Sequence, residues 1–114
     1  MKWLGTLAAL GLGGLVGTAG AVGPGVGTGS ISQINMGPAY GNMVFIQLSG
    51  GKTNVPGCSN NPTWYFVLPL TNPLGDELLA AILTARVSNT PVTIYGTGEC
   101  SVYSGVETLA NMVF

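Results

Sequence analysis

The sequence predicts a mainly-β domain with a single helix, and three observations lead to that prediction. Residues 71–88 (TNPLGDELLAAILTARVS) are the only stretch after the N-terminal segment with convincing helical periodicity. The rest of the chain consists of short runs rich in β-branched and aromatic residues, separated by Gly and Pro turns. The total length of 114 residues is that of one domain.

The N-terminal segment has the features of a secretory signal peptide. Lys2 precedes an uncharged stretch at residues 3–20, and Ala19-Gly20-Ala21 matches the small-residue cleavage pattern, so residues 1–21 are expected to be removed after Ala21. A membrane anchor is the alternative, which the many glycines and the cleavage site disfavour. We therefore expect a secreted or periplasmic protein with no membrane span after cleavage.

Residues 22–29 (VGPGVGTG) are half glycine, which predicts a flexible N-terminus ahead of a folded domain at residues 30–114. In the first strand, Ile31 is out of phase with Ile34 and Met36, so it either faces outward or marks a bulge. A long polar loop follows the second strand. Five strands are predicted, at residues 30–36, 43–48, 63–68, 92–95 and 106–114.

The helix has signals at both ends. Asn72 is expected to cap its start, and Pro73 suits the first helical position. Asp76 and Glu77 in the first turn and Arg86 in the last turn match the helix dipole.

The apolar face of this helix is wider than one small sheet requires. Leu79 and Leu83 extend its main stripe round one side, which indicates either deep burial or contact with another subunit. We therefore name Leu79 and Leu83 as a candidate subunit interface. The main stripe is formed by Leu74, Leu78, Ala81, Ile82 and Ala85.

The predicted order is β-β-β-α-β-β. Five short strands with one helix between the third and fourth is the order of the OB-fold, so an OB-like five-stranded Greek-key barrel is expected. An α+β arrangement, with an open sheet covered by one helix, is the alternative.

The two cysteines, Cys58 and Cys100, are expected to form a disulfide bond in an oxidising compartment. Closing residues 58–100 into a loop raises the free energy of unfolding by about 4 kcal/mol in the chain-entropy model. A redox role is disfavoured, because there is no C-x-x-C pair and no histidine.

Catalytic chemistry is not indicated. The absence of histidine removes the commonest general base and metal ligand. Glu99 and Glu107 are expected to be solvated charges at strand ends, since their spacing enforces no facing geometry. We expect no enzyme, metal or cofactor. Lys52 and Arg86 are the only basic residues after the signal peptide, too few to bind nucleic acid.

With catalysis and nucleic-acid binding disfavoured, a role in binding another kind of ligand remains. Aromatic faces beside neutral hydrogen-bonding groups suit sugars, which present C–H faces and uncharged hydroxyls. The alternative is that the aromatic residues belong to the core and the Ser and Asn residues form turns. The candidate ligand-binding residues on this ground are Trp64, Tyr65 and Tyr103.

Several segments carry a resemblance to a known family: G-S-I-S-Q-I-N-M, P-G-C, L-L-A-A-I-L-T-A-R and V-T-I-Y-G-T-G-E-C-S. Over residues 29–114 the chain resembles small exported OB-fold proteins of Gram-negative bacteria. More distantly it resembles the B subunits of pertussis-like and subtilase-type toxins. That resemblance implies a homopentamer or similar ring that binds cell-surface glycans and carries a separate catalytic subunit. It also implies a sugar-binding serine near the first strand, for which Ser30 and Ser32 are the candidates.

These observations predict an exported, non-catalytic binding protein, such as a subunit of a homo-oligomer that binds a cell-surface glycan or a protein receptor. The alternative, from another class, is a structural or assembly protein of the cell envelope.

Overall fold

The computed structural model describes residues 23–114, so the predicted signal peptide at residues 1–21 lies outside the described residues. Eight elements build the sheet and its helix, and one short 3₁₀ helix, η3, spans Pro38–Tyr40. The eight are β1 (Val26–Gly29), β2 (Ile31–Met36), β3 (Met43–Leu48), β4 (Lys52–Thr53), β5 (Phe66–Pro69), α3 (Gly75–Ser88), β6 (Val92–Gly96) and β7 (Glu107–Val113).

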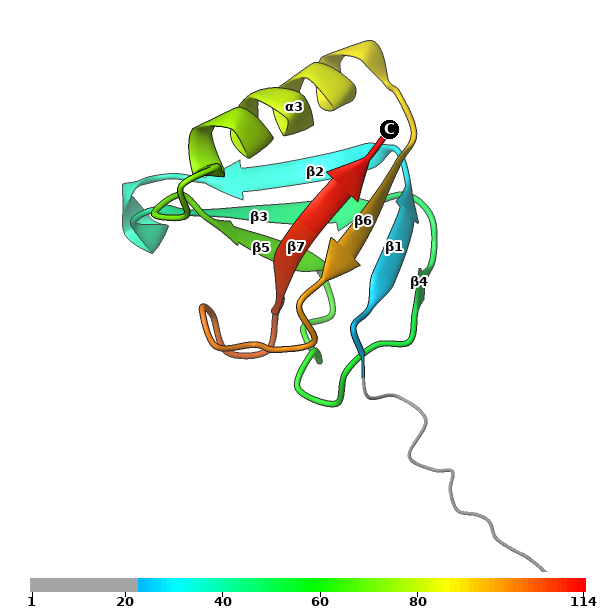
Figure 1. Cartoon of the computed structure of the whole chain (residues 1–114), viewed down its shortest axis with the longest axis vertical. Coiled ribbons are helices and arrows are strands. Elements are labelled where there is room, and N and C mark those ends of the chain that lie inside the picture. Colours follow the sequence, from blue (N-terminus) through cyan, green and yellow to red (C-terminus); the bar gives the residue numbers. More distant parts are fainter. Residues whose placement is uncertain (1–22) are drawn as a thin grey trace, which may run out of the picture.

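The strands form one mixed sheet in the order β2-β3-β5-β7-β6-β1-β4 (Figure 1). β5 and β7 pair in parallel, and the other neighbouring strands pair antiparallel. The mainly-β class with one helix between the third and fourth predicted strands is confirmed. The predicted closed five-stranded barrel is not: the sheet has seven strands and runs open from β2 to β4.

The two additional strands come from segments that the sequence analysis assigned to a flexible N-terminus and a loop. The prediction of flexibility is wrong for Val26–Gly29, which pairs with β6 on one side and β4 on the other. Gly27 explains the error. A Cβ at this position would lie 2.9 Å from both Leu48 and Phe66, so the missing side chain allows close packing of the strand.

A bulge lies near the start of β2, because the register with β3 shifts between Ile31 and Gln33. Ile31 is buried at 2% exposure. Of the two alternatives that the sequence left open for Ile31, the bulge is therefore the one observed.

The helix starts later than predicted. Asn72 accepts the N–H of Leu74 on its side-chain oxygen and the N–H of Gly75 on its carbonyl, which forms a turn rather than a helix cap. Pro73 therefore precedes the helix. Gly75, where the helix begins, packs so closely on Leu70 that a Cβ would lie 2.8 Å from its carbonyl oxygen. At the other end Asn89 adopts a left-handed conformation and donates to the carbonyls of the last turn.

Two apolar clusters lie on opposite faces of the same strands. The larger cluster lies under α3 and includes Val44 and Ile46 of β3 together with Ile82 of the helix. The smaller cluster contains Phe45, Val67 and Val106. Because side chains alternate along a strand, β3 and β5 contribute to both.

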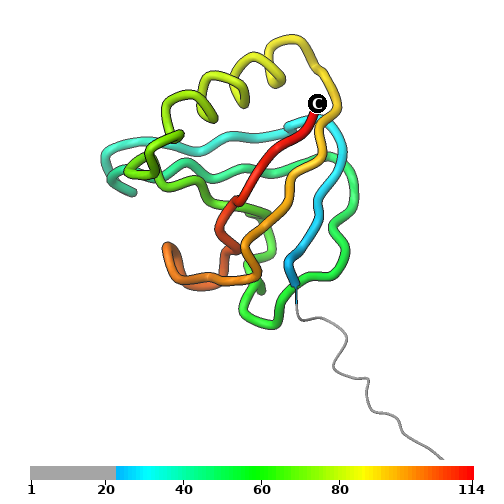
Figure 2. Tube along the Cα trace, in the orientation of Figure 1, coloured from blue at the N-terminus to red at the C-terminus, as the bar shows by residue number. Residues whose placement is uncertain are grey.

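The predicted disulfide between Cys58 and Cys100 is confirmed, with the two Cα atoms 6.0 Å apart. Figure 2 shows the loops that carry these cysteines, in green and orange, meeting at the end of the molecule farthest from the helix. One loop leads into β5 and the other into β7, so the bond joins the entrances of the two parallel strands.

Candidate ligand-binding surface

Four aromatic rings gather on the smaller cluster and form what we call the aromatic surface: Tyr40, Phe45, Trp64 and Tyr103. Phe45 lies at its centre and is 1% exposed. Its ring centroid lies 4.8 Å from that of Tyr103, 5.1 Å from that of Tyr40 and 6.0 Å from that of Trp64. Tyr40 is exposed, whereas Trp64 and Tyr103 are half-buried. The surface therefore combines a buried apolar base with partly accessible rings.

The loops position Trp64 and Tyr103 through hydrogen bonds as well as through the disulfide. The side-chain oxygen of Asn61 accepts the N–H groups of Thr63 and Trp64, at 2.9 and 2.8 Å. The carbonyl of Gly105 accepts the N–H groups of Asn60 and Asn61, both at 3.0 Å. Gly105 has a φ of +87°, which favours glycine. The two loops are thus tied directly to one another, and the rings they carry are held against Phe45.

Uncharged hydrogen-bonding groups continue this surface along the neighbouring strands. Asn35 lies opposite Phe45 and Gln33 lies opposite Gln47 in the β2–β3 register, so these four side chains share one face of the sheet. The Ser32 hydroxyl donates to the Gln47 side-chain oxygen at 2.9 Å and to its carbonyl at 3.1 Å. We call Ser32, Gln33, Asn35 and Gln47 the polar row.

Gln47 connects the polar row to the chain just before Trp64. Its side-chain amide donates to the Thr63 carbonyl at 3.0 Å. Ser32, Gln47 and Thr63 therefore form one chain of hydrogen bonds across three adjacent segments, and this fixes the orientation of the Gln47 amide beside the aromatic rings.

The structure brings together three of the five sequence-predicted ligand-binding residues. Trp64 and Tyr103 both pack on Phe45, and Ser32 lies in the polar row on the same face. Tyr65 does not join them: it packs on the larger cluster, and its hydroxyl donates to the Gly50 carbonyl at 3.1 Å. Ser30 lies at the bend between β1 and β2, where its N–H donates to the Ser49 hydroxyl.

Sequence reasoning missed Phe45 and Gln47 as part of this surface. The signal was present in the alternation along β3, where Met43, Phe45 and Gln47 share the face opposite Val44 and Ile46. That signal is ambiguous in the sequence, because both faces of the strand are rich in apolar residues.

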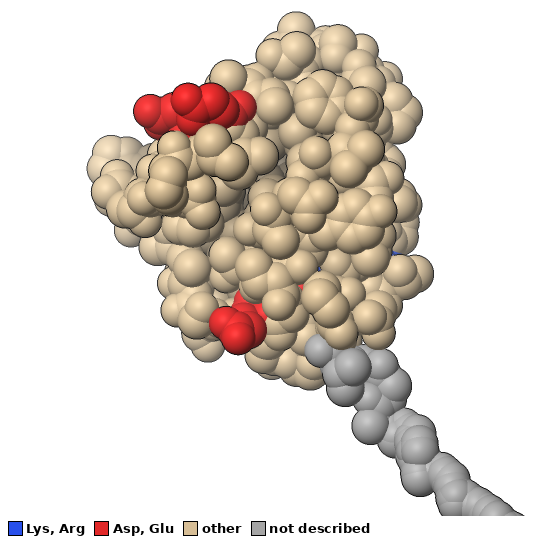
Figure 3. Space-filling model, in the orientation of Figure 1, with Lys and Arg blue, Asp and Glu red and all other residues tan. Residues whose placement is uncertain are grey.

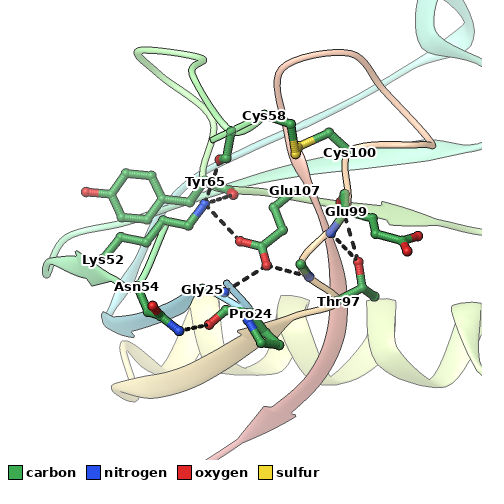
Figure 4. A network of polar contacts seen from close by, with 12 residues as sticks. Pro24, Gly25, Lys52, Asn54, Cys58, Tyr65, Thr97, Glu99, Cys100 and Glu107 are labelled. Carbon is green, nitrogen blue, oxygen red and sulfur yellow. Dashed lines mark hydrogen bonds and ion pairs between the residues drawn. A yellow bond between two sulfur atoms is a disulfide. The ribbon is translucent and has the colours of Figure 1, made fainter. Parts of the chain in front are cut away.

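A second feature, a buried carboxylate, lies inside the molecule near the Cys58–Cys100 disulfide (Figure 4). Glu107 was expected to be a solvated charge, and that expectation is wrong: the residue is fully buried. One carboxylate oxygen, Oε2, accepts the N–H groups of Gly25 and Gly98, each at 2.8 Å. The other, Oε1, lies 3.5 Å from Lys52 Nζ (Figure 4). A buried charge requires such partners.

Lys52 is also largely buried, with a side chain that is only 9% exposed. Its ammonium group donates to the Tyr65 carbonyl at 2.8 Å and to the Ser59 hydroxyl at 3.0 Å, and it lies 4.4 Å from the centroid of the Phe66 ring. Burial lowers the pKa of Lys52 below its usual 10.5, and the nearby Glu107 charge partly opposes that shift. The buried Lys52–Glu107 pair therefore holds β4 against β7 and does not present an acid and a base to solvent.

Leu79 and Leu83, the candidate interface residues, lie in different environments. Leu79 packs on the larger cluster beside Leu78, whereas Leu83 is 41% exposed. Leu74, which was expected to face the core, is 60% exposed because it precedes the first helical turn. Burial of Ile82 and Ala85 agrees with the predicted stripe.

Within residues 23–114, no group of three or more His, Cys, Asp or Glu side chains is arranged to hold a metal ion. No helix in that part of the chain is long and apolar enough to cross a membrane. Comparisons of the chain with protein-family models, with curated proteins and with solved structures found no match.

Proposed function

We propose that this protein is an exported, non-catalytic binding protein whose aromatic surface and polar row recognise a neutral glycan. One observation carries the proposal: Trp64 and Tyr103, partly accessible, are held on Phe45 next to a line of uncharged amide and hydroxyl groups. Rings of this kind pack on the C–H face of a sugar, while amides and hydroxyls bond to its hydroxyl groups.

The distribution of charge supports a neutral ligand. The polar row and the aromatic surface contain no ionisable carboxylate or amine. On the face of the molecule that Figure 3 shows, acidic side chains gather at the start of α3 and at one place near the opposite end. A charged ligand would find few partners on an aromatic surface and a polar row that carry no charged side chain.

A non-catalytic role is supported by the use that the fold makes of its carboxylates. Glu107 is engaged inside the molecule, and the chain has no histidine to act as a base. Export is supported by the disulfide, because such bonds persist in oxidising compartments.

We further infer that the sheet is an OB-like barrel in which β1 and β2 are halves of one bent strand. Only Ser30 separates them, yet they lie near opposite ends of the strand order. Gly29, with a φ of +115°, lies at the bend. If β1 and β2 count as one strand and β4 is set aside, the order β2-β3-β5-β7-β6-β1 begins and ends on that strand, as in a Greek-key barrel.

The test is a glycan-array screen of the purified protein, followed by titration of the best binder. Trp64 is the only tryptophan after the predicted cleavage site, so its fluorescence reports directly on the proposed surface. We expect a saturable fluorescence change, and Trp64→Ala, whose affinity is measured by calorimetric titration because it lacks the reporter, should weaken binding about tenfold, which corresponds to about 1.4 kcal/mol.

Tyr95→Ala is the matched control, because Tyr95 is an exposed aromatic residue on β6 outside the aromatic surface. It should bind as the unaltered protein does. A protein that binds no neutral glycan on the array, or a Trp64→Ala variant that binds with full affinity, would contradict the proposal.

A further inference from the structure

A row of exposed apolar side chains runs along the outer side of α3. Ala80, Leu83 and Val87 follow one another at spacings of three and four residues, so they lie on one side of the helix. Leu83 is 41% exposed and Val87 is 87% exposed, while Ile82 and Ala85 on the opposite side are buried. We call Ala80, Leu83 and Val87 the outer stripe.

A shallow, open groove of about 360 Å³ lies beside the outer stripe and is lined by Leu83, Thr84, Val87 and Ser88. It lies on the side of the strands away from the aromatic surface, since α3 covers the larger cluster and the aromatic surface covers the smaller one. Apolar side chains gathered beside a groove mark a contact surface more often than isolated exposed residues do.

The charges of the described residues indicate what occupies it. Lys52 and Glu107 pair in the interior, which leaves Asp76, Glu77, Arg86 and Glu99 as the exposed charges of residues 23–114. Three of these four lie on α3, with both acids in the first turn and Arg86 in the last turn. The start of α3 is therefore acidic and its last turn is basic, with Ala80 and Leu83 between Asp76 and Arg86 and with Val87 just beyond Arg86.

Such a helix is complementary to an antiparallel copy of itself. In that arrangement Arg86 of each copy lies near Asp76 of the other, Ala80 and Leu83 of both copies lie between the two ion pairs, and the two helix dipoles oppose one another. A parallel arrangement would instead place like charges together. The self-complementary pattern favours a second copy of this chain over an unrelated partner.

We propose that the outer face of α3 is a twofold interface between two copies of this protein, formed by the outer stripe and by one Asp76–Arg86 ion pair on each side of the twofold axis. The axis passes near Ala80, the outer-stripe residue closest to the midpoint between Asp76 and Arg86. This interface replaces the Leu79–Leu83 contact predicted from sequence, because Leu79 packs on its own core. It does not depend on the glycan proposal.

The experiment is sedimentation equilibrium of the purified protein over a wide concentration range. We expect a monomer–dimer equilibrium. Leu83→Glu should abolish the dimer, and Arg86→Asp should raise the dissociation constant about tenfold, because both symmetric ion pairs become like-charge contacts. Asp76→Arg should do the same, and the double variant Asp76→Arg with Arg86→Asp should restore dimerisation.

Thr53→Glu is the matched control, since it adds the same charge as Leu83→Glu at an exposed position on β4. It should dimerise normally. Ala80→Cys should give a covalent dimer on mild oxidation, because a residue beside a twofold axis meets its own copy. Circular dichroism of each variant verifies folding, and the charge-reversal series decides the question if Leu83→Glu does not fold.

Three results would overturn the proposal. The first is a protein that stays monomeric up to about 1 mM, beyond which specific association has little meaning. The second is a larger closed ring or a continuous spread of masses, which would indicate another interface or an array. The third is a dimer whose dissociation constant does not change on charge reversal, or is not restored to its original value in the double variant.

Discussion

At the scale of single residues, Glu107 shows how this fold accommodates a buried charge. Its carboxylate is surrounded by two glycine N–H groups and by Lys52. Gly25 and Gly96 leave space for it, because a Cβ at either position would collide with the carboxylate. Since its partners come from β4 and from the segments beside β1 and β6, Glu107 on β7 links four parts of the chain.

Removing that charge should therefore be costly. We predict that Glu107→Gln lowers the free energy of unfolding by about 3–5 kcal/mol, because Lys52 is left buried without its counter-charge. The matched change Glu99→Gln, at an exposed position, should stay within about 0.5 kcal/mol of the unaltered protein. Urea denaturation measures both. Equal midpoints for the two variants would show that the buried pair contributes nothing.

At the scale of elements, the two loops joined by Cys58 and Cys100 carry the accessible rings of the candidate site. Trp64 follows the first loop, and Tyr103 lies within the second. Hydrogen bonds from Asn60 and Asn61 to Gly105 support the same junction. The disulfide therefore stabilises the fold and also restrains the binding surface.

We predict that replacing both cysteines by serine lowers the free energy of unfolding by about 2–4 kcal/mol, because the denatured chain regains the freedom of a long loop. Trp64 fluorescence should also move to longer wavelength as the loops loosen. Mass spectrometry of the unaltered protein under non-reducing conditions should find the two cysteines joined. Free thiols in the exported protein would contradict both the bond and the proposed compartment.

At the scale of the whole molecule, the two apolar clusters are not independent. Each strand of the pair β3 and β5 presents one face to the larger cluster and the other face to the smaller one. Loss of either cluster would expose the strands that hold the other together. A domain of this size with shared strands is expected to unfold in one cooperative step.

This leads to a test with two probes. Trp64 fluorescence reports on the smaller cluster, while far-ultraviolet circular dichroism follows the whole sheet and α3. Their denaturation curves should coincide in midpoint and slope. If the fluorescence transition came at lower denaturant, the aromatic surface would be a separately unfolding unit and the shared-strand argument would fail.

The sequence by itself determined the features that depend on local pattern. The order of the five main strands and the helix, the pairing of the cysteines and the end of the helix follow from periodicity, turn residues and charge placement. These signals lie within a few residues of the element they specify, or, for two cysteines, leave only one pairing to form. Trp64 and Tyr103 were named as candidates because their residue types suit sugar contact, and Ser32 because of the family resemblance.

Only the tertiary structure decided the rest. Gly27 contributes to a strand because Leu48 and Phe66 from distant parts of the chain pack closely against it. Glu107 is buried because Lys52 and two glycine N–H groups reach it from other segments. Phe45 and Gln47 belong to the candidate surface, and Leu79 to the core, because of which neighbours cover each face. The physical reason is common to all of these cases: burial and hydrogen-bond satisfaction depend on residues that are remote in sequence, and no local pattern encodes them.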